Sequence, residues 1–127
     1  MNNEHYDAIV IGAGQAGPSL AGRLSQEGQK TAIIERHLMG GTCVNTGCIP
    51  TKTMVASARV AHLARRAADY GVSIESPIVV DMKRVKARKD AIVESSQLGV
   101  TGWVKGMDNV TLIRGHARLE GPREVSV

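Results

Sequence analysis

The chain has 127 residues and 43% of them are hydrophobic, which is enough to build the core of one domain. Only Tyr6, Tyr70 and Trp103 are aromatic, so that core must be aliphatic and rich in alanine. No apolar run approaches the ~20 residues of a membrane span, and the start of the chain lacks the basic and then apolar segments of a secretory signal. These features exclude a membrane protein and predict a cytoplasmic one.

The first elements predict a β-α-β unit. Residues 6–11 are typical of a buried strand, and a glycine-rich turn follows at once. Residues 18–27 are typical of a helix, with Pro18 in the first turn, where a missing N–H costs nothing. Residues 30–35 form a second short apolar strand, and the whole unit has the expected length of about 30 residues.

Two long helices are predicted next. A glycine-rich irregular stretch at residues 37–49 leads into an alanine-rich helix at residues 50–70. A loop at 72–80 precedes a second helix at 81–98, for which Asp81 is a suitable N-cap. That second helix carries a basic cluster: Lys83, Arg84, Lys86, Arg88 and Lys89. With a net charge of +4 the cluster could contact nucleic acid, but its position on one face of an amphipathic helix favours a solvated surface.

Three strand-like pieces end the chain, at residues 109–113, 117–119 and 124–127. Parallel sheets are normally covered on both faces and have more than two strands. A chain that ends within a strand is therefore predicted to be part of a longer α/β protein.

The glycine-rich turn has the spacing of a dinucleotide site. Gly12 permits a tight turn, Gly14 lets the backbone approach a pyrophosphate, and Gly17 lets the helix pack closely on the strand. Phosphates would then lie at the free N–H groups of the helix. Glu35 at the end of the second strand can accept hydrogen bonds from ribose hydroxyls and would repel a 2′-phosphate. FAD and NAD both use this arrangement, so the turn alone leaves the choice open.

Cys43 and Cys48 are five residues apart. In a regular helix they would be about 7.5 Å apart along the axis, whereas the Cα atoms of a disulfide are ~4.4–6.8 Å apart. If the two bond, the backbone between them must leave helical geometry, which Asn45 and Gly47 make easier. A helix that starts near Pro50 would point its N-terminus at this loop and favour the thiolate form.

Three other interpretations of the cysteines compete with a redox pair. Zinc sites usually need a second Cys or His pair at ligand spacing, and the chain has none. Two inert buried thiols are possible, and a purely structural disulfide is disfavoured in the cytoplasm. A redox pair is the favoured hypothesis, and no metal site is predicted.

Residues 40–52, GGTCVNTGCIPTK, resemble the redox-active segment of the class I pyridine nucleotide–disulfide oxidoreductases, which include dihydrolipoyl dehydrogenase, glutathione reductase and mercuric reductase. The resemblance implies an incomplete α/β domain with a Rossmann-like FAD/NAD(P)-binding fold, in which residues 1–127 are the N-terminal portion: the β-α-β unit, two long helices and the start of a β-meander. It also implies that the first glycine-rich turn binds FAD. The FAD-binding residues carried over are Gly12, Ala13, Gly14, Gln15, Ala16, Gly17, Glu35, Arg36, Gly41, Thr42, Cys43, Lys52, Gly115, His116 and Ala117.

The resemblance further implies roles for the two sulfurs. Cys43 matches the thiol that attacks the substrate, Cys48 the thiol against the flavin, and Lys52 the lysine near flavin N5. Electrons would pass from NAD(P)H through FAD to the disulfide and on to a small dithiol, disulfide or Hg(II) substrate, in a homodimer without nucleic-acid or membrane partners. Thr46, Thr51 and Pro18 depart from the usual pattern and are closest to mercuric-reductase-like proteins. The alternative is a flavoprotein or redox sensor in which FAD or the cysteine pair is structural or regulatory.

Overall fold

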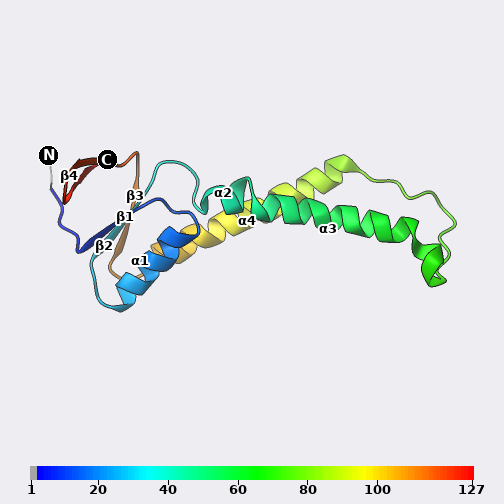
Figure 1. Cartoon of the computed structure of the whole chain (residues 1–127), viewed down its shortest axis with the longest axis horizontal. Helices are drawn as coiled ribbons and strands as arrows, with labels where there is room; N and C mark the ends of the chain where they lie inside the picture. The colour runs from blue at the N-terminus through cyan, green and yellow to red at the C-terminus, as the bar shows by residue number, and fades with distance from the viewer. Residues whose placement is uncertain (1–2) are drawn as a thin grey trace.

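The computed structural model describes residues 3–127 and places them in a small parallel sheet from which a long helical hairpin projects (Figure 1). The sheet contains β1 (Ala8–Ile11), β2 (Thr31–Glu35) and β3 (Val110–Arg114), in that order. The helices are α1 (Ala16–Gln26), α2 (Gly41–Asn45), α3 (Cys48–Arg65) and α4 (Met82–Lys105), with a 3₁₀ turn, η1, at Ala67–Tyr70. A separate hairpin joins β4 (Arg118–Gly121) to β5 (Glu124–Ser126).

The parallel sheet confirms the predicted β-α-β unit and adds a third strand. Ala8 pairs with Thr31, and Thr31 pairs with Val110, so β2 is the central strand. Its residues Thr31–Ile34 are all buried, because strands lie on both sides and α1 packs against it. The strand predicted at 109–113 is therefore β3 of this sheet, whereas the pieces predicted at 117–119 and 124–127 become the antiparallel hairpin.

The core is aliphatic, as the composition predicts. It gathers Val10, Ala13, Ala21, Ile33, Met39 and Val104. Val104 is fully buried although the second long helix was predicted to end at residue 98. That prediction was wrong because Gly99 and Gly102, which weaken a helix locally, are outweighed by the packing of the last turns of α4 on the core.

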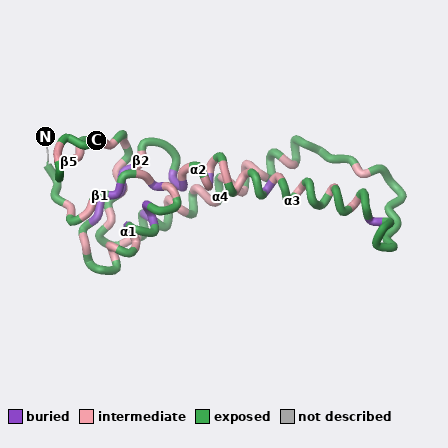
Figure 2. The backbone as a smooth tube through the Cα atoms, in the orientation of Figure 1, coloured by how far each residue is buried: buried purple, intermediate pink, exposed green. Residues whose placement is uncertain are grey.

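The paired helices α3 and α4 project away from the sheet, and most of their residues are exposed (Figure 2). Asp81 caps α4 as predicted, accepting hydrogen bonds from the backbone N–H groups of Lys83 and Arg84 at 3.0 and 3.1 Å. The 3₁₀ turn ends at Tyr70, where the sequence predicted the end of a single longer helix. Among the described residues, no helix is both long and apolar enough to cross a membrane.

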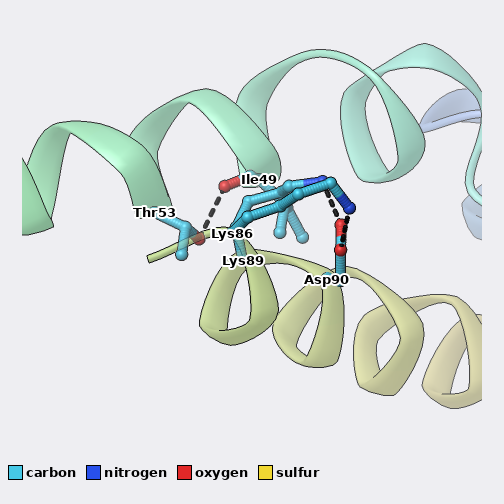
Figure 3. A network of polar contacts seen from close by, with 5 residues as sticks. All are labelled: Ile49, Thr53, Lys86, Lys89 and Asp90. Atoms are coloured by element: carbon cyan, nitrogen blue, oxygen red, sulfur yellow. Dashed lines mark hydrogen bonds and ion pairs between the residues drawn. The ribbon is translucent and has the colours of Figure 1, made fainter. Parts of the chain in front are cut away.

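The basic cluster on α4 is only partly a solvated face. Arg88 reaches across to α3, where its Nη1 donates to the carbonyl of Thr53 at 3.1 Å and to the hydroxyl of Ser57 at 3.3 Å. Lys86 and Lys89 both bind Asp90, next to the turn in which Thr53 bonds back to Ile49 (Figure 3). The hydrogen bond from Lys86, followed by that from Lys89, lowers the pKa of the Asp90 carboxyl. Arg88 therefore helps to join the two long helices, whereas the ion pairs of Lys86 and Lys89 lie within α4.

Candidate redox and nucleotide site

In the turn between β1 and α1, each glycine is required for a different physical reason. Gly12 has φ +99°, which L side chains rarely adopt, and its N–H donates to Ile34 at 2.8 Å. A Cβ on Gly17 would lie 2.0 Å from the Gly12 carbonyl oxygen, so only glycine lets α1 approach the turn. A Cβ on Gly14 would meet nothing within 4 Å. Gly14 therefore borders open space near the N-terminus of α1, at the position that the sequence predicts for a pyrophosphate.

The two sequence motifs meet at this turn. The N–H of Gly40 donates to the carbonyl of Ala13 at 2.7 Å, and Gly40 has φ +92°. A Cβ on Gly41 would lie only 2.8 Å from the Cα of Gly14. Backbone therefore packs directly on backbone, and the cysteine-containing segment becomes one wall of the open space beside Gly14.

Glu35 is held in place by backbone donors. Its Oε2 accepts from the N–H of Ala13, and its Oε1 accepts from the N–H of His37, both at 2.8 Å. Partial burial raises the pKa of the Glu35 carboxyl, but these hydrogen bonds and the nearby charge of Arg114 outweigh it, so the pKa lies below its ordinary value of 4.5. Each carboxylate oxygen keeps a lone pair for a further donor, which suits a ribose hydroxyl.

The low pKa of Glu35 gives a testable pH dependence. A depressed pKa means that the carboxylate stabilises the fold above the unfolded-state value, and that this contribution disappears as pH falls from 4.5 through the folded-state value. Glu35→Gln should therefore be less stable than the wild type near neutral pH. The difference should shrink as pH falls from 4.5 through the folded-state pKa of Glu35, measured by denaturant unfolding across the acid range. A difference that does not change with pH would contradict this assignment.

A cavity of about 260 Å³ lies beside Glu35, close in size to small-ligand pockets. Residues from both ends of the chain line it: Ile11, Gly12, Ile34, Glu35, Arg36, Gly115, His116 and Ala117. The structure thus brings the Gly115–Ala117 segment, predicted to contact the nucleotide, next to the first turn and the end of β2. The N–H of Gly115 donates to the Glu35 carbonyl at 3.1 Å, which fixes this closure.

Cys43 and Cys48 form a disulfide with a Cα–Cα distance of 4.6 Å. The backbone between them leaves helical geometry as predicted: Thr46 has φ −136° and ψ −2°, and Gly47 has φ −119° and ψ −109°. The predicted irregular stretch nevertheless contains the short helix α2, which carries Cys43, and α3 begins at Cys48 itself, two residues before Pro50. The two sulfurs bond each other, so two separate inert thiols are not the arrangement found.

The remaining predicted residues lie around this centre. Lys52 is exposed one turn after Cys48 on α3, and Thr42 is exposed one residue before Cys43. Gln15 reaches from the start of α1 toward the carbonyl of Gly40 at 3.5 Å. Ala16 is exposed at the same helix start. The first free N–H groups of α3 belong to Cys48 and to the next residue, so the positive end of the helix dipole lies at this sulfur.

Two residues of this region make contacts that the sequence did not predict. Arg114 donates to the carbonyl of His37 at 2.8 Å and adds positive charge beside Glu35. Asn45 donates from Nδ2 to the carbonyls of Met39 and Gly41, each at 2.9 Å. The sequence predicted only that Asn45 eases a bend in the backbone. Its side-chain contacts could not be predicted, because carbonyl groups that converge on one side chain leave no sequence pattern.

A glycine turn that closes on a disulfide at the start of a long helix is the arrangement that the sequence predicts for a dinucleotide beside a redox pair. The chain belongs to the pyridine nucleotide-disulphide oxidoreductase family, which matches residues 6–126. It is 42% identical over 124 residues to a dihydrolipoyl dehydrogenase of Rhizobium etli and 40% identical over 122 residues to that of Thermus scotoductus. These alignments cover 98% and 96% of the chain but 26% of each relative.

Solved structures agree with the sequence relatives. The Cu(II) complex of the HOCl-induced flavoprotein disulfide reductase RclA from Escherichia coli superposes with a TM-score of 0.77 at 30% identity, covering 94% of this chain and 24% of that one. The predicted family and the Rossmann-like α/β fold are therefore confirmed. The chain spans about a quarter of the length of these relatives. The predicted likeness to mercuric-reductase-like proteins is not tested by these relatives and stays a prediction.

Proposed function

We propose that this chain is the FAD-binding part of an NAD(P)H-dependent flavoprotein disulfide oxidoreductase whose redox centre is the Cys43–Cys48 pair. The observation that carries the proposal is the close packing of the cysteine segment on the dinucleotide turn, where Gly41 lies against Gly14. The path proposed for a bound dinucleotide therefore runs from the Glu35 cavity past Gly14 toward the disulfide. Family membership supports the same reading.

The residues of the chain fit FAD along that path. The cavity between Glu35 and Gly115–Ala117 suits the adenosine, with the Glu35 carboxylate as acceptor for the ribose hydroxyls. The open space at Gly14 suits the pyrophosphate, next to the N-terminus of α1 and to Gly41 and Thr42. Lys52 lies four residues after Cys48 on α3 and therefore on the same face of that helix, which suits a place beside the flavin. When bound, the flavin supplies the conversion of hydride transfer from NAD(P)H into electron transfer to sulfur.

The protein groups account for the sulfur chemistry. The disulfide takes up two electrons, the S–S bond breaks, and two thiols or thiolates form once protons are added from solvent. The N-terminus of α3 stabilises negative charge on Cys48. Cys43, one turn before the bend, acts as the thiolate that attacks a substrate disulfide. The first half of the substrate leaves as a thiolate and takes a proton. Cys48 then attacks the sulfur of Cys43 in the mixed disulfide, which releases the second half of the substrate as a thiol and restores the Cys43–Cys48 bond.

The domain organisation follows from the same reasoning. We propose that residues 1–127 are the N-terminal portion of the FAD-binding domain, and that the rest of that domain, the NAD(P) domain and a dimerisation domain belong to the same polypeptide. β1 supports this, because Ile9 and Ile11 point to one face of the sheet and remain 39% and 55% exposed. A parallel sheet normally has both faces covered. We expect the intact polypeptide to form a homodimer in the cytoplasm.

A dithiol or disulfide is the favoured substrate class. The relatives named above are dihydrolipoyl dehydrogenases and a disulfide reductase, which supports carbon-bound sulfur over Hg(II). NADH and NADPH are both compatible with the residues of this chain. Hg(II) is kept as the second substrate, because the same pair of thiols binds a soft metal ion once reduced.

The test is anaerobic reduction of the intact polypeptide with its bound flavin. On addition of NADH or NADPH, the spectrum should gain the long-wavelength absorption of a thiolate next to oxidised flavin, and two thiols per chain should become reactive. The protein should then reduce lipoamide or another small disulfide. Yellow protein that gains neither the absorption nor the thiols would instead indicate a structural flavoprotein. Thiols that appear without turnover of any dithiol, disulfide or Hg(II) substrate would indicate a redox sensor.

A further inference from the structure

The side chain of Asn45 lies between the two cysteines in sequence and ties together the turn that precedes them. Its Nδ2 donates to the carbonyl of Met39 and to the carbonyl of Gly41, each at 2.9 Å. Met39 is fully buried in the core, so one of the two contacts is anchored on fixed packing. Both hydrogen atoms of the amide are thereby used.

The turn held by Asn45 serves both halves of the site. It contains Gly40, whose N–H donates to Ala13, and Gly41, which packs on Gly14. It also leads directly into α2, which presents Cys43 to Cys48 at a Cα–Cα distance of 4.6 Å. A change in this turn would therefore move Cys43 relative to Cys48, which belongs to the separate helix α3.

The amide oxygen of Asn45 indicates that the side chain is present for its two N–H donors. Oδ1 of Asn45 is buried and has no hydrogen-bond partner among residues 3–127. An unsatisfied buried acceptor destabilises the fold, and reversing the amide would turn this oxygen toward two carbonyl oxygens. The side chain is thus kept for its two donors despite the cost, and serine or aspartate cannot supply both.

We propose that Asn45 is a positioning residue for the redox pair: by bridging the Met39 and Gly41 carbonyls it holds Cys43 at bonding distance from Cys48. Holding two thiols close raises their effective concentration and so favours the disulfide over the dithiol. Loss of the bridge makes the disulfide easier to reduce. The inference rests on the proposed function only in that the pair must cycle between disulfide and dithiol.

The experiment measures the thiol equilibrium in the intact flavin-containing polypeptide. Wild type, Asn45→Ala and Asn45→Asp are equilibrated anaerobically with dithiothreitol buffers, alkylated, and analysed by mass spectrometry for the fraction of Cys43–Cys48 that is bonded. Both variants should shift the equilibrium toward the dithiol by tenfold or more, which corresponds to about 30 mV. Thr46→Val is the matched control, since Thr46 is exposed in the same loop and its hydroxyl makes only a 3.5 Å contact to the carbonyl of Thr42.

A merely structural Asn45 would give a different result. It would lower the unfolding temperature of oxidised and reduced protein equally and leave the thiol equilibrium within twofold of the wild type, and that outcome overturns the proposal. If the aspartate variant does not fold, the alanine variant, which lacks the added repulsion between oxygens, decides the question. Neither NAD(P)H nor a substrate is used, so a protein that fails the turnover test can still show the shift, and a protein that turns over can still lack it.

Discussion

Replacing either cysteine by serine in the intact polypeptide should abolish reduction of disulfide substrates by NAD(P)H, lowering turnover by more than about a hundredfold because no exchange through sulfur remains. Flavin content and the unfolding transition under reducing conditions should stay close to those of the wild type, because serine has nearly the same size. Steady-state turnover and bound flavin, measured on the same preparations, check the prediction. Turnover that survives either change would remove the basis of the proposed function.

The two single-cysteine variants should differ from each other in reactivity. In Cys43→Ser, the remaining Cys48 lies at the first position of the 18-residue helix α3, where the helix dipole favours thiolate. In Cys48→Ser, the remaining Cys43 lies within the five-residue helix α2 and lacks that stabilisation. Cys48 should therefore react faster with iodoacetamide near neutral pH in apoprotein. Equal rates would show that the start of α3 does not act on the sulfur.

The nucleotide half of the site could be predicted well from the sequence, because each requirement is local. Gly12 and Gly17 are specified by a tight turn and a close contact, and both reasons are found in the structure. The role of Gly115–Ala117 depended on the family resemblance instead. No local pattern says that a segment some 80 residues after β2 returns to the same cavity, since only the pairing of β3 with β2 brings it there.

The predicted ends of helices were wrong where tertiary packing outweighs local sequence preference. The glycines at 99 and 102 favour an earlier end for α4, but Val104 is fully buried and keeps the helix intact to Lys105. Arg88 was assigned to solvent because charge runs usually are, and its hydrogen bonds to α3 depend on a neighbour 31 to 35 residues away. Asn45 was overlooked for the same reason, since its partners are defined by a fold and not by a spacing.

A second large effect is expected at Gly17. In Gly17→Ala, the new Cβ would lie 2.0 Å from the carbonyl oxygen of Gly12 and 3.4 Å from Val10, so backbone itself must move. Overpacking of this kind costs about 1–3 kcal/mol or more, and here the displaced group is the turn that faces the pyrophosphate. The variant should therefore lose both stability and flavin, measured by denaturant unfolding and by absorbance per chain.

Gly14→Ala should separate the loss of flavin from the loss of stability. A Cβ at this position meets nothing within 4 Å, and the backbone of Gly14 lies outside the left-handed region, so the fold should tolerate it. The same methyl group would occupy the space assigned to the pyrophosphate, so flavin affinity should fall by about tenfold or more while stability of the flavin-free protein is unchanged. Gly99→Ala, on the exposed face of α4 with no neighbour within 4 Å, should keep flavin and gain stability of about 0.5–1 kcal/mol. If Gly14→Ala bound flavin as tightly as Gly99→Ala, the open space at the turn would not be where the phosphates lie, and the path from the Glu35 cavity to the disulfide would have to run elsewhere.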